Sequence, residues 1–511
     1  MEHDVDKIRD VSIVGGGDSG LIAALSLESE NPDLDIRVID DFDRKPPEVG
    51  KASFSALLDI LHNELNVNLK RFHKEVKPVW KLSAHYINWS DSEFDYTFDT
   101  GTIEFGNGNE KLSTTYRFYK RDYYPTLAQE IISDGRVPLK KASENKYHLY
   151  RPVAYHLNLG RFNEFLRKLC RERNIELIND EIKTVECDEN RIKFIEGRKK
   201  YESDLYVDST GFSKILANEQ NRKFIEFDFP VDSAVFAKKN IEKGDIEHFT
   251  SFKLGESGWF WQIDTYENRD LGYVYSSGRI TEKQAKDQLK NEANLGDDED
   301  IKSISWDSGH LERPWLANCL AIGNSQGFVE PLQATNLTTS AILSVEISKA
   351  LSESQCLVTQ ETKKGINKEC RLYWDSIYSF LLLHYNLAEG VSEFWRSFDN
   401  KNERLADVKD IYEQYGFAKI RLGRQKMELY PEEMKIFPLF DYLYLMREFN
   451  IDSGFYDQKS IEVSQKIDEG VNKRKEAQKL RSEEFLSKEE FWNDDIYKEI
   501  FEEGSEIQFI R

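Results

Sequence analysis

The sequence predicts an α/β fold in which a parallel sheet receives β-sheet insertions and is followed by a mostly helical C-terminal lobe. Residues 11–27 carry the main observation, because an apolar run (VSIV) breaks into the turn GGGDSG and then into an Ala-rich helix. A second apolar run, NCLAI at 318–322, also ends in a glycine and precedes a helix predicted over 337–351. From about residue 352 the apolar residues recur with helical spacing.

The turn after the first strand has the spacing G-x-G-x-x-G, which is typical of a Rossmann-type dinucleotide-binding sheet in this context. Gly15 permits the tight turn, Gly17 lets backbone N–H groups approach a pyrophosphate, and Gly20 lets the helix pack on the strand. The N-terminus of the helix favours the phosphate charge. Asp40 closes the next apolar run, where its carboxylate can accept hydrogen bonds from ribose hydroxyls.

Length and composition limit the class of protein. A chain of 511 residues is too long for one ordinary domain, and two or three lobes are expected. No apolar stretch is long enough to span a membrane and the N-terminus is charged, so we expect a soluble, cytoplasmic protein. A net charge of −22 argues against a nucleic-acid partner. The five cysteines lack a C-x-x-C pair, which predicts reduced thiols and no metal site. A homo-oligomer is possible, and the sequence leaves the oligomeric state open.

Two loops are candidates for contact with a flat cofactor. The segment EVGKAS at 48–53 is a small-residue loop before a helix, and it offers Gly50, Lys51 and Ala52 to a cofactor unless it is only a turn. Gly323 ends the later apolar run and begins a second strand–loop–helix junction, whose N-terminal amides can bind an anion or touch the edge of a ring.

The predicted strand in VWKLSAHYINWS (79–90) carries Lys81 between Trp80 and Leu82. A charged group in such an apolar context is either a surface lysine whose stem lies along apolar surface or a residue kept for chemistry, and spacing alone does not decide between them.

The stretch WFWQI (259–263) has the period of a strand, which puts Trp259, Trp261 and Ile263 on one face and Phe260 on the other. Two neighbouring indoles form either a wall or ordinary core packing. The segment LGYVYSS (271–277) is the natural pairing strand.

The order of these segments resembles that of flavin-dependent halogenases of the tryptophan-halogenase type, from about residue 11 to residue 395. GGGDSG is similar to the family's GGGTAG, EVGKAS to GVGEAT, DSTGF (208–212) to DCSGF, and WFWQI matches W-x-W-x-I. WKLSAHYINW aligns with the segment that holds the family's catalytic lysine, and Lys81 is the residue in register.

The resemblance implies a Rossmann-type FAD-binding lobe like that of flavin monooxygenases. It would occupy residues 1–350 discontinuously, with an interleaved β-sheet substrate region, and residues 351–511 would form a helical lobe that caps the substrate site. A separate reductase would supply FAD as FADH2, and oxygen would form a flavin C4a-hydroperoxide. A halide ion (chloride, bromide or iodide) would then give hypohalous acid, which passes a tunnel walled by Trp259 and Trp261. Directed by Lys81, it would halogenate an electron-rich aromatic small molecule.

One motif departs from the family pattern. The halide site of the family lies at the Thr-Gly of P-L-E-S-T-G, and the chain has PLQATN at 331–336, so the resemblance assigns the halide to Thr335 and Asn336. Asn tolerates a positive φ better than most residues, which makes the Gly-to-Asn change mild. Gln333 replaces the glutamate that partners the catalytic lysine, and an amide can donate and accept hydrogen bonds but cannot act as a base. We therefore expect a ring activated by its own hydroxyl, or a more reactive halide, rather than free tryptophan with chloride.

Two other functions fit parts of the sequence. A flavin-dependent aromatic monooxygenase would hydroxylate its substrate without halide, and the tryptophan pair would then have to leave room for the ring at the flavin. A non-catalytic flavin-binding protein fits the altered 331–336 motif, but it gives no reason for Lys81 and W-x-W-x-I to occur together.

Overall fold

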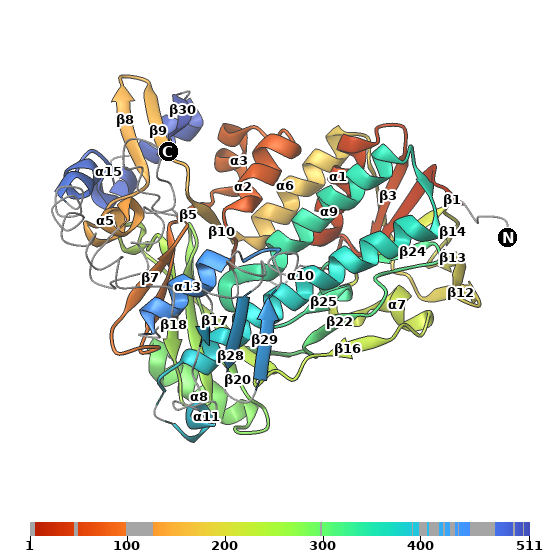
Figure 1. Cartoon of the computed structure of the whole chain (residues 1–511). Coiled ribbons are helices and arrows are strands. Elements are labelled where there is room, and N and C mark those ends of the chain that lie inside the picture. The colour runs from red at the N-terminus through yellow and green to blue at the C-terminus, as the bar shows by residue number, and fades with distance from the viewer. Residues whose placement is uncertain are drawn as a thin grey trace. The chain divides into compact units, whose positions relative to one another are not determined.

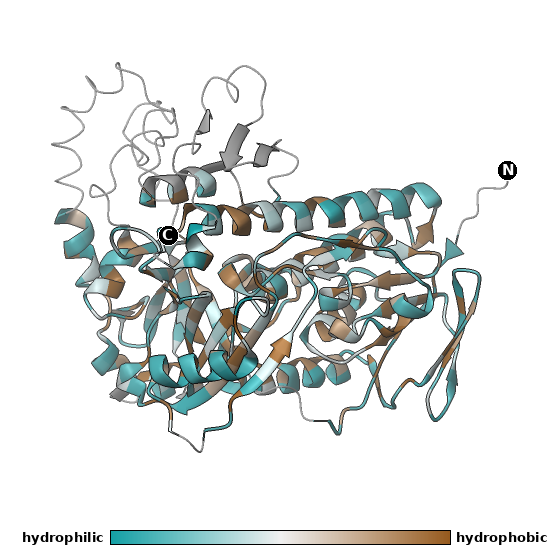
Figure 2. Ribbon diagram, turned by 90° about the horizontal axis from the view of Figure 1, so that it is seen from below, coloured by the Kyte–Doolittle hydropathy of each residue, from teal (hydrophilic) through white to brown (hydrophobic). Residues whose placement is uncertain are grey.

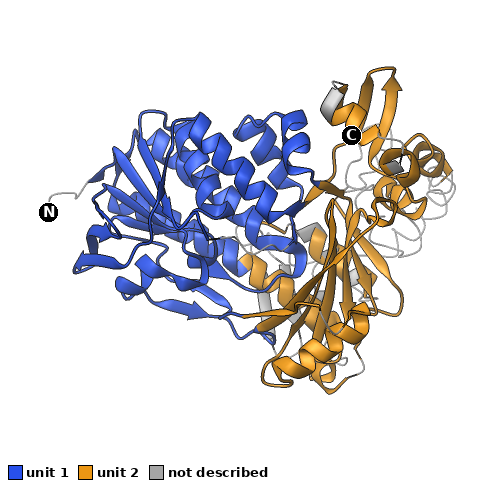
Figure 3. Cartoon of the chain, turned by 180° about the vertical axis from the view of Figure 1, so that it is seen from behind, with its two compact units in different colours: residues 1–78, 157–232, 305–375 blue, residues 79–156, 233–304, 376–511 orange. Residues whose placement is uncertain are grey.

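The computed structural model describes residues 6–44, 50–98, 126–296, 299–390, 392–397, 406–407, 418–422, 425–429, 435–437, 439–449, 476–493, 496–503 and 505–510. The chain forms two compact units, each assembled from three segments (Figure 3). Unit 1 comprises residues 1–78, 157–232 and 305–375, and unit 2 comprises residues 79–156, 233–304 and 376–511. These boundaries differ from the division at residue 350 suggested by the sequence. One reason is that β26 (Leu357–Val358) pairs with β1 (Asp6–Lys7).

Unit 1 contains the predicted dinucleotide-type sheet (Figure 1). Its order is β11-β3-β2-β15-β24-β23, with the first five strands parallel and β23 antiparallel. The bounds are β11 (Glu176–Asn179), β3 (Asp35–Asp40), β2 (Asp10–Val14), β15 (Leu205–Asp208), β24 (Cys319–Ala321) and β23 (Trp315–Leu316). The apolar runs at 11–14, 204–212 and 318–322 thus supply neighbouring parallel strands, and the α/β fold prediction is confirmed.

The helices of unit 1 pack around α1 (Asp18–Glu30), which contacts both α6 (Leu159–Glu172) and α9 (Thr335–Glu353). Every residue of α1 from Gly20 to Leu27 is buried, as expected for a helix that is apolar all round. Smaller elements complete the unit: α2 (Ala56–Asp59), η1 (Ile60–Glu64), α3 (Leu69–Val76), β12 (Thr184–Asp188), β13 (Arg191–Glu196), β14 (Lys200–Tyr201), α7 (Ile215–Glu219), β16 (Phe224–Glu226), β22 (Gly309–Leu311) and β25 (Gly327–Phe328).

Unit 2 is built on a seven-stranded sheet in the order β21-β17-β20-β19-β18-β6-β7. The bounds are β21 (Lys302–Ser305), β17 (Ser233–Asn240), β20 (Asn268–Tyr275), β19 (Gly258–Asp264), β18 (Phe249–Leu254), β6 (Ser83–Ile87) and β7 (Phe94–Thr97). The strand β19 pairs antiparallel with β20, as the sequence predicted for WFWQI and LGYVYSS. The helix α8 (Glu282–Ala293) packs on β17 and β20 through its buried Ala285 and Leu289.

Further strands and helices complete unit 2. The strand β5 (Val79–Lys81) pairs antiparallel with β10 (Ala154–Asn158), and the hairpin of β8 (Leu139–Ser143) and β9 (Lys146–Tyr150) takes β30 (Glu506–Ile510) as a parallel neighbour. The remaining elements are α5 (Leu127–Ser133), α11 (Glu393–Arg396), β27 (Ala406–Asp407), β28 (Ala418–Leu422), β29 (Gln425–Leu429), α13 (Leu439–Glu448), α15 (Lys488–Asn493), α16 (Ile496–Lys498) and η9 (Glu499–Glu503). The C-terminal third therefore adds strands to its helices, because segments such as EIQFI complete hairpins formed elsewhere in the chain.

The unit boundary falls inside the long helix α10 (Gln360–Leu387), which contributes residues to both units. Figure 2 shows hydrophobic residues along the strands and a mixture of hydrophobic and hydrophilic residues along the helices, as expected for helices that pack on a sheet. Among the residues that the structure describes, no helix has the length and apolarity needed to cross a membrane.

Candidate active site

The glycine turn of unit 1 has the backbone that a dinucleotide site requires. Gly15 has φ +104°, and a Cβ on it would lie 2.2 Å from the carbonyl oxygen of Ser209. A Cβ on Gly20 would lie 2.1 Å from the carbonyl oxygen of Gly15, so the helix can approach the turn only without a side chain there. A Cβ on Gly17 would meet nothing within 4 Å, and the turn is therefore open on the side where backbone N–H groups can face a ligand.

Asp40 ends β3 and binds the turn itself. Its Oδ2 accepts a hydrogen bond from the backbone N–H of Gly16 at 2.7 Å, and its Oδ1 accepts from the N–H of Asp41 at 2.9 Å. A carboxylate has about four acceptor sites, so these bonds orient the side chain and leave capacity for the ribose hydroxyls that the sequence assigns to it.

The other cofactor candidates of unit 1 lie near this turn or are linked to it. Gly323 has φ +65°, and a Cβ on it would lie 2.6 Å from Oγ of Ser19, the second residue of α1. Gly50, Lys51 and Ala52 form the short strand β4 (Gly50–Ala52) and not a loop, while the first two residues of EVGKAS lie outside the described residues. Lys51 reaches the glycine turn through an ion pair with Asp18.

In the 331–336 segment the residues with a positive φ differ from the one that the sequence suggested. Gln333 (φ +63°) and Ala334 (φ +55°) are both left-handed, whereas Asn336 is an ordinary residue of α9. The expectation that Asn336 takes over a positive φ from glycine is therefore wrong. Left-handed non-glycine residues typically cost about 1–3 kcal/mol each and cluster at ligand sites, and turns of this kind form anion-binding nests of N–H groups.

Two buried side chains and one partly exposed side chain, that of Asn336, belong to this turn. Gln333 is 4% exposed and Thr335 is 2% exposed. Asn336 donates a hydrogen bond from Nδ2 to Oδ1 of Asn324, while its own Oδ1 is buried and has no hydrogen-bond partner among the described residues.

Lys81 is a buried residue of unit 2 and not a surface lysine. Its side chain is 1% exposed, and its Nζ lies 5.3 Å from the centre of the Phe98 ring. Burial lowers the pKa of Lys81 from 10.5 to about 7, because the charged form loses its hydration in an apolar environment. Near neutral pH the amine and ammonium forms are therefore both populated.

A fully buried histidine on the paired strand belongs to the environment of Lys81 and was not identified from the sequence. His156 forms two hydrogen bonds, from Nδ1 to the carbonyl oxygen of Asp264 at 2.9 Å and between Nε2 and Oγ1 of Thr250 at 2.8 Å. Burial, and then the charge of Lys81, hold the pKa of His156 well below 6.5. The ring is thus neutral at pH 7, and its two partners fix its orientation.

The carboxylate at the end of β19 is neutralised locally. Asp264 is fully buried, and its Oδ2 lies 2.7 Å from the guanidinium of Arg269. The acid that directly follows WFWQI is therefore paired within the strand hairpin.

The two tryptophans of β19 lie next to each other. The ring centres of Trp259 and Trp261 are 6.1 Å apart, and Nε1 of Trp259 donates to the hydroxyl of Tyr385 at 2.8 Å. The indole of Trp261 fills the space above Gly272, where a Cβ would lie 2.0 Å from the ring. Phe260 packs instead with the residues under α8, as the strand period predicts.

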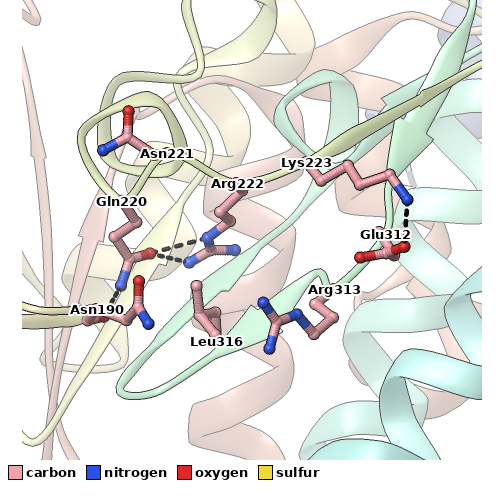
Figure 4. A pocket seen from close by; sticks show the side chains of 8 residues that line it. All are labelled: Asn190, Gln220, Asn221, Arg222, Lys223, Glu312, Arg313 and Leu316. Carbon is pink, nitrogen blue, oxygen red and sulfur yellow. Dashed lines mark hydrogen bonds and ion pairs between the residues drawn. The ribbon is translucent and has the colours of Figure 1, made fainter.

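The predicted site residues are divided between the units: Lys81, Trp259 and Trp261 belong to unit 2, and the glycines, Asp40, Gln333, Thr335 and Asn336 belong to unit 1. Two cavities lie elsewhere within single units. In unit 2 a cavity of about 510 Å³ lies beside α8, and Trp261 is its one lining residue among those predicted. In unit 1 a cavity of about 30 Å³ lies around Arg222 (Figure 4).

The cavity of unit 1 does not replace the predicted site. The cavity of unit 1 is too small for an aromatic ring. Its Arg222 is occupied by Gln220 and by the carbonyl oxygens of Pro314 and Cys319 (Figure 4 shows the bonds to Gln220), and Lys223 pairs with Glu312. In the described part of the chain no group of three His, Cys, Asp or Glu residues could hold a metal ion.

Comparisons with known proteins show the family to which the chain belongs. The sequence model of the tryptophan halogenase family matches residues 10–502. Tryptophan 7-halogenase RebH of Lentzea aerocolonigenes is 26% identical over 433 residues, covering 78% of this chain and 80% of RebH. Among solved structures, the tryptophan 5-halogenase MibH has a TM-score of 0.78 at 22% identity, covering 96% of this chain and 94% of MibH. BrvH, a flavin-dependent halogenase from Brevundimonas sp. BAL3, has a TM-score of 0.76 at 21% identity, covering 96% of this chain and 99% of BrvH.

Proposed function

Because the chain belongs to the tryptophan halogenase family and is a flavin-dependent halogenase of aromatic substrates, we propose that Lys81 directs hypohalous acid to an electron-rich ring. The reaction uses FADH2 from a separate flavin reductase, oxygen, and chloride, bromide or iodide. Gln333 takes the catalytic position of the carboxylate that partners the lysine in the family, and Thr335 and Asn336 hold the halide. Trp259 and Trp261 wall the passage that keeps the ring away from the flavin.

The observation that carries this proposal is the burial of Lys81 with a pKa of about 7. A neutral amine can take the halogen as a haloamine, and an ammonium can donate a hydrogen bond that polarises hypohalous acid. Both forms are available near neutral pH, so the proposal covers either route. A lysine held at its usual pKa would offer only the ammonium.

Unit 1 supplies the residues that would hold FAD. The turn of Gly15, Gly17 and Gly20 opens toward a ligand at the N-terminus of α1, Asp40 stands at the end of β3, and Gly323 lies against Ser19. When bound as FADH2, the flavin would supply the two electrons that reduce oxygen to the level of a peroxide, which can then oxidise a halide ion. Gly17 keeps a side chain out of the open side of the turn, where the pyrophosphate of the cofactor would lie.

The 331–336 turn is proposed to hold the halide and to limit the choice of substrate. The turn joins two left-handed residues to the N-terminus of α9, an arrangement that favours a small anion. Gln333 offers an amide where the family has a carboxylate, so the ring proton must leave without help from that side chain. Phenols, whose own hydroxyl activates the ring, need less such help. RebH and MibH are tryptophan halogenases, and tryptophan is therefore one arm of the test.

The proposal is tested in one reaction mixture with FAD, a flavin reductase, NADH, and tryptophan, indole, phenol and pyrrole as substrates. Chloride, bromide and iodide are supplied separately, and the products are analysed by mass spectrometry. Halogenated product that disappears in Lys81→Met, but persists in the exposed control Lys283→Met, supports the proposal. Equal product from Lys81→Met would show that free hypohalous acid reacts without Lys81. Hydroxylated product without halide would establish the monooxygenase instead.

Gln333→Glu tests the substrate choice. If the missing carboxylate is what disfavours free tryptophan, this variant raises the yield of chlorotryptophan relative to halogenated phenol. An unchanged ratio would show that other residues select the ring.

A further inference from the structure

Two segments of unit 1 that carry predicted cofactor residues are joined by an ion pair. Nζ of Lys51, in β4, donates a hydrogen bond to Oδ2 of Asp18 at 2.7 Å, across 33 positions of sequence. Asp18 lies inside the glycine turn and is the first residue of α1. Its side chain is 13% exposed and that of Lys51 is 33% exposed, so the pair is partly shielded from solvent.

The carboxylate of Asp18 occupies the electropositive end of α1. Its Oδ1 accepts from the backbone N–H of Ser19 at 2.9 Å, and the preceding Gly17 has no side chain to cap the helix. A carboxylate at this position is favourable while no other anion is present. The glycine spacing, however, assigns the same helix terminus to a pyrophosphate, and two anions close together repel each other.

The two residues also depart together from the motifs that the chain resembles. The turn reads GGGDSG against GGGTAG, and the second segment reads EVGKAS against GVGEAT. A threonine and a glutamate at these two positions carry a net charge of −1. Asp18 with a glutamate at position 51 would instead give two carboxylates, and Lys51 with a threonine at position 18 would give an uncompensated cation. The two exchanges together produce a neutral pair.

We propose that Lys51 is a positioning residue whose charge neutralises Asp18, so that the N-terminus of α1 can receive the anionic pyrophosphate of FAD. The pair also ties β4 to the glycine turn, which couples the two cofactor segments of unit 1. Neither side chain takes part in halogenation. The inference rests on the FAD site of the proposed function and adds to it the residue that makes the acidic turn compatible with an anion.

A double-mutant cycle on FAD binding tests the inference. FAD is titrated into Lys51→Met, Asp18→Asn and the double variant, and the dissociation constant is read from the quenching of flavin fluorescence. Since Lys51→Met leaves a carboxylate at the helix terminus, we expect it to weaken FAD binding about five- to tenfold. Asp18→Asn removes the repulsion and should bind FAD at least as tightly as the unaltered chain. In the Asp18→Asn background, Lys51→Met should weaken FAD binding less than about twofold, because the carboxylate that Lys51 neutralises is absent.

Two controls sharpen the cycle. Lys364→Met removes a lysine of an exposed ion pair with Glu361 in unit 1 and should leave the dissociation constant unchanged. Raising the ionic strength from about 0.05 M to 0.5 M should shrink the effect of Lys51→Met, because salt screens the repulsion. Thermal unfolding of each variant without FAD shows whether the fold is retained, and Asp18→Asn keeps the test decisive if Lys51→Met does not fold.

Three results would overturn the inference. An equal loss from Lys51→Met in both backgrounds would mean that Lys51 acts on FAD independently of Asp18. Unchanged affinity in every variant would mean that the pair has no role in binding. Weaker FAD binding by Asp18→Asn would mean that the carboxylate helps the cofactor instead of repelling it. Halogenation is not measured, so a protein that binds FAD but halogenates nothing would refute the proposed function and leave this inference intact.

Discussion

Replacing Lys81 by methionine should make the protein more stable at pH 7, and the gain should shrink as the pH rises. Lys81 has a pKa of about 7 in the folded chain and about 10.5 when exposed. Below pH 7 both states bind the proton, and the folded state carries the full cost of the buried charge. Between pH 7 and 10.5 the unfolded state binds a proton that the folded state has lost, so the stability of the unaltered protein rises with pH.

The size of this effect follows from the pKa difference. One pKa unit corresponds to about 1.4 kcal/mol, and half of the buried amine is already neutral at pH 7. Between pH 7 and pH 9 the unaltered protein should therefore gain about 2 kcal/mol of unfolding free energy relative to Lys81→Met.

The assay is urea-induced unfolding of both proteins at pH 7, 8 and 9, with Lys283→Met as the exposed control. The difference between the unaltered protein and Lys81→Met must close with pH, while the control follows the unaltered protein. A difference that stays constant over this range would mean that the folded pKa of Lys81 is not lowered, and the chemical argument for a neutral amine would fail.

Three further predictions concern the turn, the tryptophan pair and a second buried base. Gly20→Ala brings a Cβ within 2.1 Å of a backbone oxygen and should cost about 3 kcal/mol in urea unfolding, whereas Gly17→Ala should keep the stability and lose FAD binding. Gly272→Ala must displace the Trp261 indole and should cost about 2 kcal/mol and change the near-ultraviolet circular dichroism; an unchanged spectrum would contradict the packing. Burial lowers the pKa of His248 to about 4, so the unfolded state binds a proton before the folded state does as the pH falls from 7 to 4. Over this range the unaltered protein should lose about 3 kcal/mol of unfolding free energy relative to His248→Gln. Parallel curves of unfolding free energy against pH for the two proteins would refute this.

Local sequence patterns were sufficient to predict the glycine turn and the alternation of side chains along β19. The turn at Gly15–Gly20 needs glycines for steric reasons that involve neighbouring backbone, and the structure has a positive φ at Gly15 and contact distances at Gly20 that no side chain allows. The period of WFWQI assigned Trp259 and Trp261 to one face because alternation is a property of any strand.

Other expectations depended on contacts that the pattern does not contain. The positive φ expected at Asn336 falls on Gln333 and Ala334, because the register between the turn and α9 is set by how α9 packs. The strand β30 joins β9 across more than 350 positions, and no local signal shows where such a strand pairs.

The sequence by itself determined the α/β fold, the glycine turn and the family, because these rest on backbone sterics, on periodicity and on the order of short motifs. The tertiary structure decided the state of Lys81 and the pairing of Asp18 with Lys51. A pKa depends on how much water the surrounding segments exclude, and an ion pair depends on which side chains the fold brings within hydrogen-bonding distance. Both quantities are sums over residues far apart in the chain, so they exist only once the chain has folded.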